Sequence, residues 1–382
     1  MILPPAARTP LAPALRGPRA AEGEVRVARQ LLVEAAKADA FGKPRAALLM
    51  RALARTVPRS GAIGRLLAAW PGDLAQDAIT FRLSAGLHAL ARTGRAPGLA
   101  ALFADEAQEE GAAALPDPLA LEAAVLAALT EHAVALGAWI AHPTQTNEVA
   151  RVAGLVAVLM ALDAAGEAMP CEVLELGASA GLNLNFPHYA CRIGEQIAGT
   201  PGSAVELAPE WRGSLPPVGP VEVVRAQGVD LHPLDPASPA DCARLEAYVW
   251  PGERARSRRL TAALDLARRH PPAVAQGHAG EWLERALAAP QLAGLRRVVF
   301  HSMVMQYADP HERARLDAAL AAAGARATRE RPLVRVGMEW RGDRAAVELR
   351  VTLWDGGPRA GEVRLAALCH PYGEWIEWRG LD

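Results

Sequence analysis

The part of the chain with the clearest chemical potential is CEVLELGASAGLNLNF, which runs from residue 171 to residue 186. Its apolar first half predicts a buried strand, and the small residues after it predict a tight turn into a helix. A serine between two glycines at such a turn suits the nucleophile of a serine hydrolase, here Ser179. The same strand–loop–helix joint can instead bring bare backbone close to a nucleotide-like cofactor. The segment alone leaves both chemistries open.

The order of the surrounding elements counts against the hydrolase. A nucleophile elbow lies in the middle of a sheet, after several strands and after a loop that supplies an oxyanion N–H. No alternating β-branched run precedes Cys171, and no His-Gly-Gly loop occurs in the chain. Asp309 and His370 do follow Ser179 in the order that a triad requires. The hydrolase therefore remains the alternative.

The residues around the loop favour a cofactor. Glu175 stands two residues before Gly177, which gives E-x-G-x-S-x-G with Ser179 in the middle glycine position. This pattern resembles the first motif of Rossmann-like S-adenosylmethionine (SAM) methyltransferases, and it differs from the G-x-G-x-x-G of nicotinamide enzymes. Gly177 and Gly181 would permit close approach of the ligand, and the next helix would offer free N–H groups. An acid at the strand end, Glu175, can accept from the ammonium group of the cofactor. A tight joint without a ligand is the plainer alternative.

The resemblance implies further cofactor contacts on later segments. Asp230 ends the run VVRAQGVD, where these enzymes hold the two ribose hydroxyls, and an insertion at about residues 192–220 must then separate it from the loop. Asp230 is otherwise a turn or N-cap residue. In AVAQGHAGEWL, His278 replaces an acid often found beside the adenine. Asn183 would reach the ligand, or tie the loop down through side-chain-to-backbone bonds.

The run RRVVFHSMVMQY resembles the strand beside the glycine loop. Because ligands lie at the carboxyl ends of parallel strands, His301, Ser302 and Gln306 are expected near the reacting group. His301 suits a general base, since an ordinary histidine titrates near neutrality. A histidine after an apolar run is otherwise a hydrogen-bonded core residue.

The segment HPTQTNE comes just before the helix that leads into the glycine-loop strand, and generic methyltransferases lack it. Its polar residues and one that follows are candidates for contacts with substrate or cofactor: Gln145, Thr146, Asn147, Glu148 and Arg151. The alternative is an ordinary helix start with Thr146 or Asn147 as N-cap. On the hypothesis of a cover, replacing Asn147 and Glu148 by alanine abolishes ligand binding and leaves the fold intact.

Together, HPTQTNEVARVAGL, LELGASAGLNLNF, GVDLHPLDP, VFHSMVMQY and HPYGEWIEW resemble one bacterial family catalogued as a domain of unknown function. The resemblance runs from about Glu24 to the end of the chain. It implies a methyltransferase-like Rossmann domain behind a helical region, with SAM as cofactor and a small molecule or protein group as methyl acceptor. A non-catalytic nucleotide-binding protein is a further alternative.

Two regions must position these residues. Residues 24–141 show helical spacing throughout, whereas 142–382 alternates short apolar runs with helical segments. We therefore expect an α/β fold: a Rossmann-like methyltransferase sheet, mostly parallel with antiparallel C-terminal strands, and an all-helical N-terminal domain. Residues 1–23 are expected to be a disordered extension. The basic run VWPGERARSRRL is expected to be a solvated helix face.

The composition fits a cytoplasmic protein with no obligatory nucleic-acid or membrane partner. The formal net charge is −1, and 51% of the residues are hydrophobic. The four cysteines form no C-x-x-C pair, so neither a metal site nor a disulfide framework is predicted. No uncharged apolar run reaches the length of a membrane helix.

Overall fold

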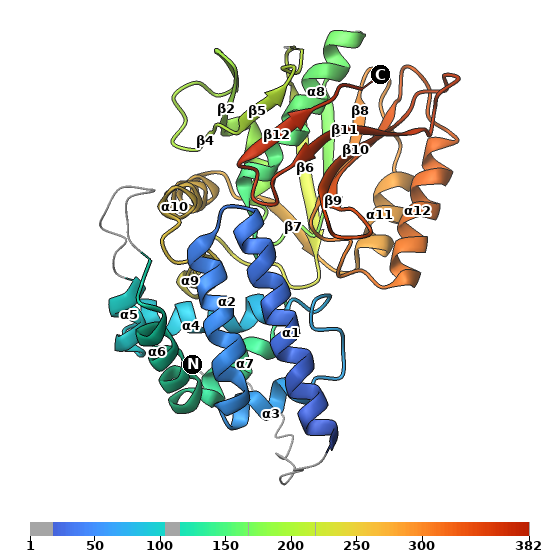
Figure 1. The fold of residues 1–382 in the computed structure, drawn as a ribbon. Coiled ribbons are helices and arrows are strands. Elements are labelled where there is room, and N and C mark those ends of the chain that lie inside the picture. Colours follow the sequence, from blue (N-terminus) through green and yellow to red (C-terminus); the bar gives the residue numbers. More distant parts are fainter. Residues whose placement is uncertain (1–17, 104–114, 167, 218, 382) are drawn as a thin grey trace. The chain divides into compact units, whose positions relative to one another are not determined.

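The computed structural model describes residues 18–103, 115–166, 168–217 and 219–381. The described residues form two compact units, one of residues 18–103 with 115–142 and the other of residues 143–381 without 167 and 218 (Figure 1). The fold is a mixed α/β structure with a helical N-terminal part and a large, mostly parallel sheet, as predicted.

The described residues of the first unit contain helices and no strand. The helices are α1 (Pro18–Ala40), α2 (Pro44–Thr56), α3 (Ala62–Ala68), α4 (Ile79–Arg92), α5 (Pro97–Phe103), α6 (Pro118–Glu131) and α7 (Ala133–Ala141), with the 3₁₀ helix η1 (Val57–Arg59) after α2. Local signals start them: α2 and α6 begin with proline, and the Asp117 carboxylate caps α6 by accepting from the N–H of Ala120. Their apolar faces meet in a core that includes Leu31, Leu53 and Leu83.

The predicted N-terminal extension is only partly described. Residues 1–17 lie outside the described residues, and residues 18–23 belong to α1 instead of a disordered segment. In the part of the chain that the structure covers, no single helix is long and apolar enough to cross a membrane. Only α6 and α7 together satisfy that test, and they are bent by 85° at their junction.

The second unit is built on one nine-stranded sheet among its described residues, in the order β5-β12-β11-β10-β9-β8-β1-β6-β7. Its strands are β1 (Cys171–Leu176), β5 (Glu210–Gly213), β6 (Val223–Asp230), β7 (Ala273–Gln276), β8 (Arg296–Ser302), β9 (Leu333–Trp340), β10 (Val347–Trp354), β11 (Val363–Cys369) and β12 (Trp375–Trp378). The run from β7 to β9 is parallel throughout, whereas β9 to β12 pair antiparallel. The antiparallel C-terminal strands were predicted; the parallel pairing of β5 with β12 at the edge was not.

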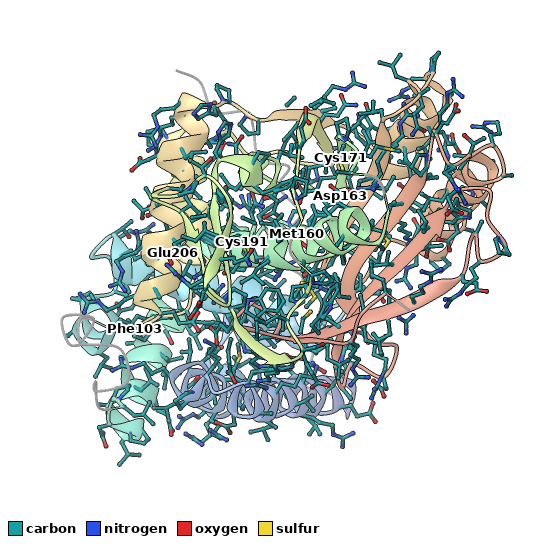
Figure 2. All side chains as sticks on the ribbon, turned by 90° about the horizontal axis from the view of Figure 1, so that it is seen from above. Phe103, Met160, Asp163, Cys171, Cys191 and Glu206 are labelled. Atoms are coloured by element: carbon teal, nitrogen blue, oxygen red, sulfur yellow. The ribbon has the colours of Figure 1, made fainter. Side chains whose placement is uncertain are left out.

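Helices cover both faces of this sheet. The helices α8 (Val152–Ala165), α9 (Pro239–Ala247) and α10 (Arg254–Arg269) share one core cluster with Cys171 and Val173 of β1. On the other face α11 (Ala279–Ala288) and α12 (Pro310–Gly324) share a second cluster with Leu174 and Leu176 (Figure 1). Because β1 is buried on both faces, its apolar residues do not alternate with exposed polar ones. Its two acids are buried as well: Glu172 pairs with Arg297, and Glu175 accepts from Asn183. Figure 2 shows α8 with Met160 and Asp163, and Asp163 pairs with Arg296 at the start of β8 at 2.5 Å.

An insertion separates β1 from β6. It holds the 3₁₀ helix η4 (Leu182–His188) and a small sheet of β2 (Ala190–Ile193), β3 (Gln196–Gly199) and β4 (Glu206–Leu207), followed by β5. The expectation of a regular helix after the glycine loop is therefore wrong. The segment contains Pro187, whose ring and missing N–H interrupt an α-helix.

Candidate ligand site at the glycine loop

The chain order of the central strands marks one end of the sheet as a place for ligands. From β1 the chain moves outward to β6 and β7 and then returns to β8 on the other side of β1. In open α/β sheets the crevice at such a switch point, beyond the carboxyl ends of the strands, is the usual ligand site. The segments that follow β1, β6 and β8 all lie at this end, because the three strands are parallel.

The glycine loop after β1 is held in left-handed backbone conformations. Its φ angles are +68° at Gly177, +55° at Ser179 and +70° at Gly181. A Cβ on Gly177 would lie 2.3 Å from Cγ2 of Val304, in the loop after β8, and one on Gly181 would lie 2.6 Å from Cγ2 of Val274. These glycines are thus required by the protein's own packing, in addition to any approach of a ligand.

The N–H groups of this loop are already bonded, which corrects the expectation that they are free. Ser179 donates to Oδ2 of Asp230 at 2.8 Å. The N–H groups of Ala180 and Leu182 both donate to Oδ1 of Asn147 at 3.2 Å. A phosphate would need these donors for itself. The loop therefore does not suit a phosphate-bearing cofactor.

Three buried polar atoms beside the loop have no hydrogen-bond partner among the described residues: Oε2 of Glu175, Oδ1 of Asn183 and Oγ of Ser179. Asn183 donates from Nδ2 to the other oxygen of Glu175 at 2.8 Å. Burial raises the pKa of Glu175 to about 8, and the charge of Asp230 adds to that rise, although the Asn183 bond opposes it. Buried polar atoms rarely stay unbonded, so this cluster suits a ligand that forms hydrogen bonds with it. A cationic donor fits best, because it would favour the ionised form of Glu175.

The segment HPTQTNE lies against the loop. Nε2 of Gln145 donates to Oδ1 of Asp230 at 3.3 Å and to the carbonyl of His232 at 3.2 Å. Asn147, with φ of +25°, bonds the loop itself as described above. Thr146 is half-buried. The segment thus holds Asp230 and the glycine loop together.

Glu148 and Arg151 belong to a buried charge network next to this segment. Oε2 of Glu148 accepts from Nε of Arg256 at 2.7 Å, and Oε1 accepts from Nη2 of Arg259 at 3.0 Å. These arginines and Arg151 lower the pKa of Glu148 to about 2, although its burial acts in the opposite direction. Replacing Glu148 by alanine would remove the carboxylate that pairs with Arg259 and one of the two that pair with Arg256, and breaking buried pairs costs on the order of 3–5 kcal/mol. The expectation that such a variant keeps an intact fold is therefore not supported.

Arg256 and Arg259 were missed by the sequence analysis. They belong to the basic run that was expected to be a solvated helix face, yet the Arg256 side chain is only 5% exposed. Their burial could have been predicted from their helical spacing with Leu260 and Ala263, which are buried on α10. Because arginine is abundant in this chain, this spacing did not stand out.

The structure does not bring His301 together with Glu175. His301 pairs in register with Leu176 and therefore points to the face of α11 and α12, whereas Glu175 points to the face of α8. His301 is 3% exposed, and both ring nitrogens are engaged. Nε2 accepts from Nε of Arg335 at 3.0 Å, so Nδ1 carries the proton and donates to Glu339 at 2.8 Å. These bonds match the alternative of a core histidine.

The other predicted residues have varied surroundings. Ser302 is half-buried at the end of β8, and Nε2 of Gln306 donates to the carbonyl of Met303 at 3.2 Å. His278 is exposed at the start of α11. Glu339, which the sequence analysis missed, accepts from the N–H groups of Val304 and Met305 as well as from His301, so it fixes the loop after β8.

No triad forms around Ser179 in the described residues. Its Oγ has no partner, Asp309 caps α12 by accepting from the N–H of Glu312, and Nδ1 of His370 accepts from the N–H of Tyr372. The residues that the hydrolase alternative requires are thus engaged elsewhere.

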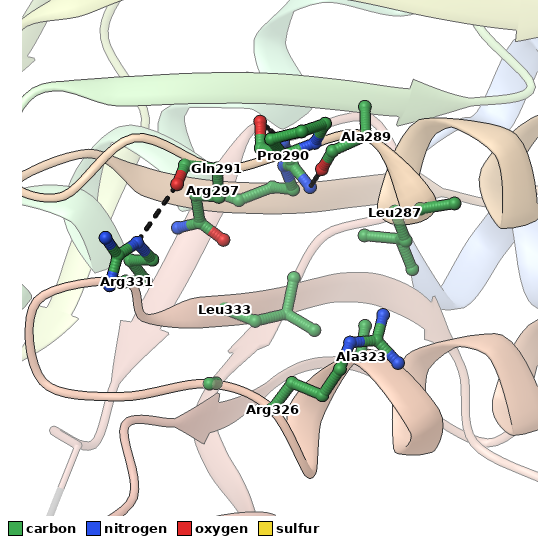
Figure 3. A pocket seen from close by; sticks show the side chains of 11 residues that line it. Leu287, Ala289, Pro290, Gln291, Arg297, Ala323, Arg326, Arg331 and Leu333 are labelled. Carbon is green, nitrogen blue, oxygen red and sulfur yellow. Dashed lines mark hydrogen bonds between the residues drawn. The ribbon is translucent and has the colours of Figure 1, made fainter.

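A pocket of about 200 Å³ lies at the other end of the sheet, among the ends of α11 and α12 and the starts of β8 and β9 (Figure 3). Its arginines are bonded to main-chain carbonyls of the pocket wall. Nη1 of Arg297 donates to Ala289 at 3.1 Å, and Nε of Arg331 donates to Gln291 at 3.1 Å. This pocket is at the amino ends of the strands, away from the switch-point crevice.

No curated protein and no solved structure matches this chain. A family model does: the one described as uncharacterized protein conserved in bacteria (DUF2332), over residues 28–378. That range contains most of the helical region, the glycine loop and every candidate site residue named above. The chain therefore belongs to the bacterial DUF2332 family.

Proposed function

We propose that this protein binds SAM at the glycine loop and transfers its methyl group to an acceptor. The observation that carries the proposal is the pair of acids at the carboxyl ends of the neighbouring strands β1 and β6. Glu175 has an oxygen without a donor, beside the equally unbonded Oδ1 of Asn183. SAM offers a donor for each position: its ammonium group for Glu175 and Asn183, and its ribose hydroxyls for Asp230.

The strand order supports this proposal over other nucleotide cofactors. The parallel run β7-β6-β1-β8-β9, with β1 as the glycine-loop strand, has the arrangement expected of a Rossmann-like methyltransferase sheet. A dinucleotide would place a pyrophosphate against the loop, whose N–H groups Asp230 and Asn147 already occupy. The Asp230 side chain beside that position would also compete with it for these donors.

In this proposal the residues act by binding and positioning. The ribose hydroxyls would replace the long Gln145 contact on Oδ1 of Asp230, while Oδ2 keeps the loop in place through Ser179. In-line methyl transfer depends mainly on the approach of the acceptor and on the exclusion of water. His301 is not assigned the role of base, because both of its ring nitrogens are bonded.

Calorimetric titration with SAM, S-adenosylhomocysteine and NAD tests the proposal. We expect micromolar binding of the first two and none of NAD. Glu175→Gln and Asp230→Asn should each weaken binding by about tenfold or more, since a charge-assisted hydrogen bond contributes about 1.5–3 kcal/mol. Asp235→Asn is the matched control, because Asp235 is exposed five residues farther along the chain.

The negative result is equally informative. If neither SAM nor S-adenosylhomocysteine binds the folded protein, the proposal is wrong. Labelling of the wild type by a fluorophosphonate, and its loss in Ser179→Ala, would then favour the hydrolase.

A further inference from the structure

One buried guanidinium in the charge network has no anionic hydrogen-bond partner. Arg151 ends the 3₁₀ helix η3 (Val149–Arg151) and is 6% exposed. Its Nε donates to the carbonyl of Pro371 at 2.8 Å. Within the residues that the structure describes, Nη1 and Nη2 of Arg151 make no hydrogen bond.

The nearest carboxylate is already used. Glu148 directs one oxygen to Arg256 and the other to Arg259, and it makes no ion pair with Arg151. Arg256 also pairs with Glu253 and lies over the ring of Tyr372. Burial is the main cause that lowers the pKa of Arg151. The charge of Glu148 opposes this effect, but without a hydrogen bond to Arg151. A buried charge without a bonded counter-ion is costly, so an anion that binds here would be strongly favoured.

Arg151 is also in the right region for a substrate group. It follows Asn147, which bonds the glycine loop, by four residues. Tyr307 raises the pKa of Arg151 electrostatically, so the two side chains are near each other. Tyr307 belongs to the loop after β8, in which Val304 packs on Gly177. The guanidinium is therefore at the carboxyl end of the sheet, near the loops that follow β1 and β8.

We infer that Arg151 binds a carboxylate or phosphoryl group of the methyl acceptor, and that the acceptor is an anionic small molecule. The planar fork of an arginine suits bidentate contact with either group, and its burial admits only a compact one. This inference rests on the proposed function. The carboxylate of the cofactor itself is a poorer partner, because it would lie with the ammonium group near Glu175. The charge that affects the pKa of Glu175 is that of Asp230, and no arginine among the described residues affects it.

The test is calorimetric titration of the full chain with succinate and with inorganic phosphate, each with and without S-adenosylhomocysteine. We expect one of these anions to bind the wild type, and the one that binds identifies a carboxylate or a phosphoryl site. Arg151→Gln should weaken that binding by about tenfold or more. Arg151→Lys, which keeps the charge and loses the fork, should give an intermediate loss.

Arg285→Gln is the matched control, because it removes an exposed arginine that pairs with Glu281 on α11. It should leave anion binding unchanged. The inference is overturned if neither anion binds the wild type, or if Arg151→Gln and Arg285→Gln behave alike. If Arg151→Gln does not fold, as judged by circular dichroism, full anion affinity in Arg151→Lys overturns it.

Binding of S-adenosylhomocysteine separates this inference from the proposed function. Arg151→Gln should keep its affinity for S-adenosylhomocysteine within about twofold of the wild type. Loss of that affinity in Arg151→Gln would mean that Arg151 serves the cofactor and would overturn the assignment to the acceptor. If the wild type binds anions through Arg151 but no S-adenosylhomocysteine, the proposed function fails and the anion site stands without it.

Discussion

The carboxyl group of Glu175 is buried on β1, where it accepts a hydrogen bond from Asn183. Burial is the main reason that its pKa rises from 4.5 to about 8. The protonated carboxyl is thus the form that the folded protein prefers at neutral pH. A cationic ligand group would reverse this preference, since it favours the ionised form. The ionisation of Glu175 is therefore coupled to the binding of a ligand.

This coupling predicts how stability depends on pH. In the unfolded chain Glu175 ionises from pH 4.5 upward, whereas the folded protein keeps the proton up to about pH 8. The folded state binds more protons in that window, so Glu175 makes the free energy of unfolding fall by about 1.4 kcal/mol per pH unit as the pH rises through it. Glu175→Gln cannot titrate and should lack this contribution.

Urea unfolding of both proteins across that window measures the effect. The stability difference between Glu175→Gln and the wild type should grow in favour of the variant up to about pH 8 and then stay constant. Taking the difference removes the other titrating groups, including Glu148, whose lowered pKa stabilises the fold above 4.5 and loses that effect as the pH falls towards 2. Parallel pH profiles for the two proteins would show that Glu175 is ionised in the folded state.

Between elements, the loops that follow β1 and β8 pack against each other at Gly177 and Val304. Val304 lies where a side chain on Gly177 would have to be. Gly177→Ala should therefore destabilise the protein in two ways. The left-handed conformation costs about 1–2 kcal/mol for an alanine, and the clash with Val304 adds to it.

Val304→Ala should relieve the clash and leave the backbone cost. The double variant Gly177→Ala/Val304→Ala is then more stable than the sum of the single variants predicts, with a coupling of about 1 kcal/mol or more in urea unfolding. Additive losses would mean that the two loops move apart without cost. A Gly177→Val variant tests packing for the same reason, so Glu175→Gln and Asp230→Asn are the better variants for ligand binding.

Much of the element pattern could be predicted, because it depends on local sequence. Periodic apolar residues identify the helices of the first unit. The apolar residues of β1 face both sides of the sheet, as its central place requires. The rest depends on distant partners. β5 joins the sheet through β12, more than 150 residues later, and no local pattern encodes that pairing. Whether His301 is a base or a core residue depends on Arg335 and Glu339 on the neighbouring strand.

In the described part of the second unit, the four cysteines belong to separate elements but to the same one of its two core clusters. They lie on β1, β2, α9 and β11, and all belong to the cluster that packs the sheet against α8: Cys171, Cys191, Cys242 and Cys369. All four are free and buried. Burial raises the pKa of Cys171 to about 11 and that of Cys191 and Cys369 to about 12.

Because the thiolate is the reactive form, a thiol reagent should not modify the native protein at a mildly alkaline pH. All four cysteines should react in concentrated urea. At intermediate urea they should become reactive together, since a single core that unfolds cooperatively exposes them in one step. Mass spectrometry of each cysteine peptide measures this. If Cys191, on the small insertion sheet, reacts at lower urea than Cys171 on β1, the insertion opens independently of the sheet that carries the glycine loop, and the second unit is not one cooperative structure.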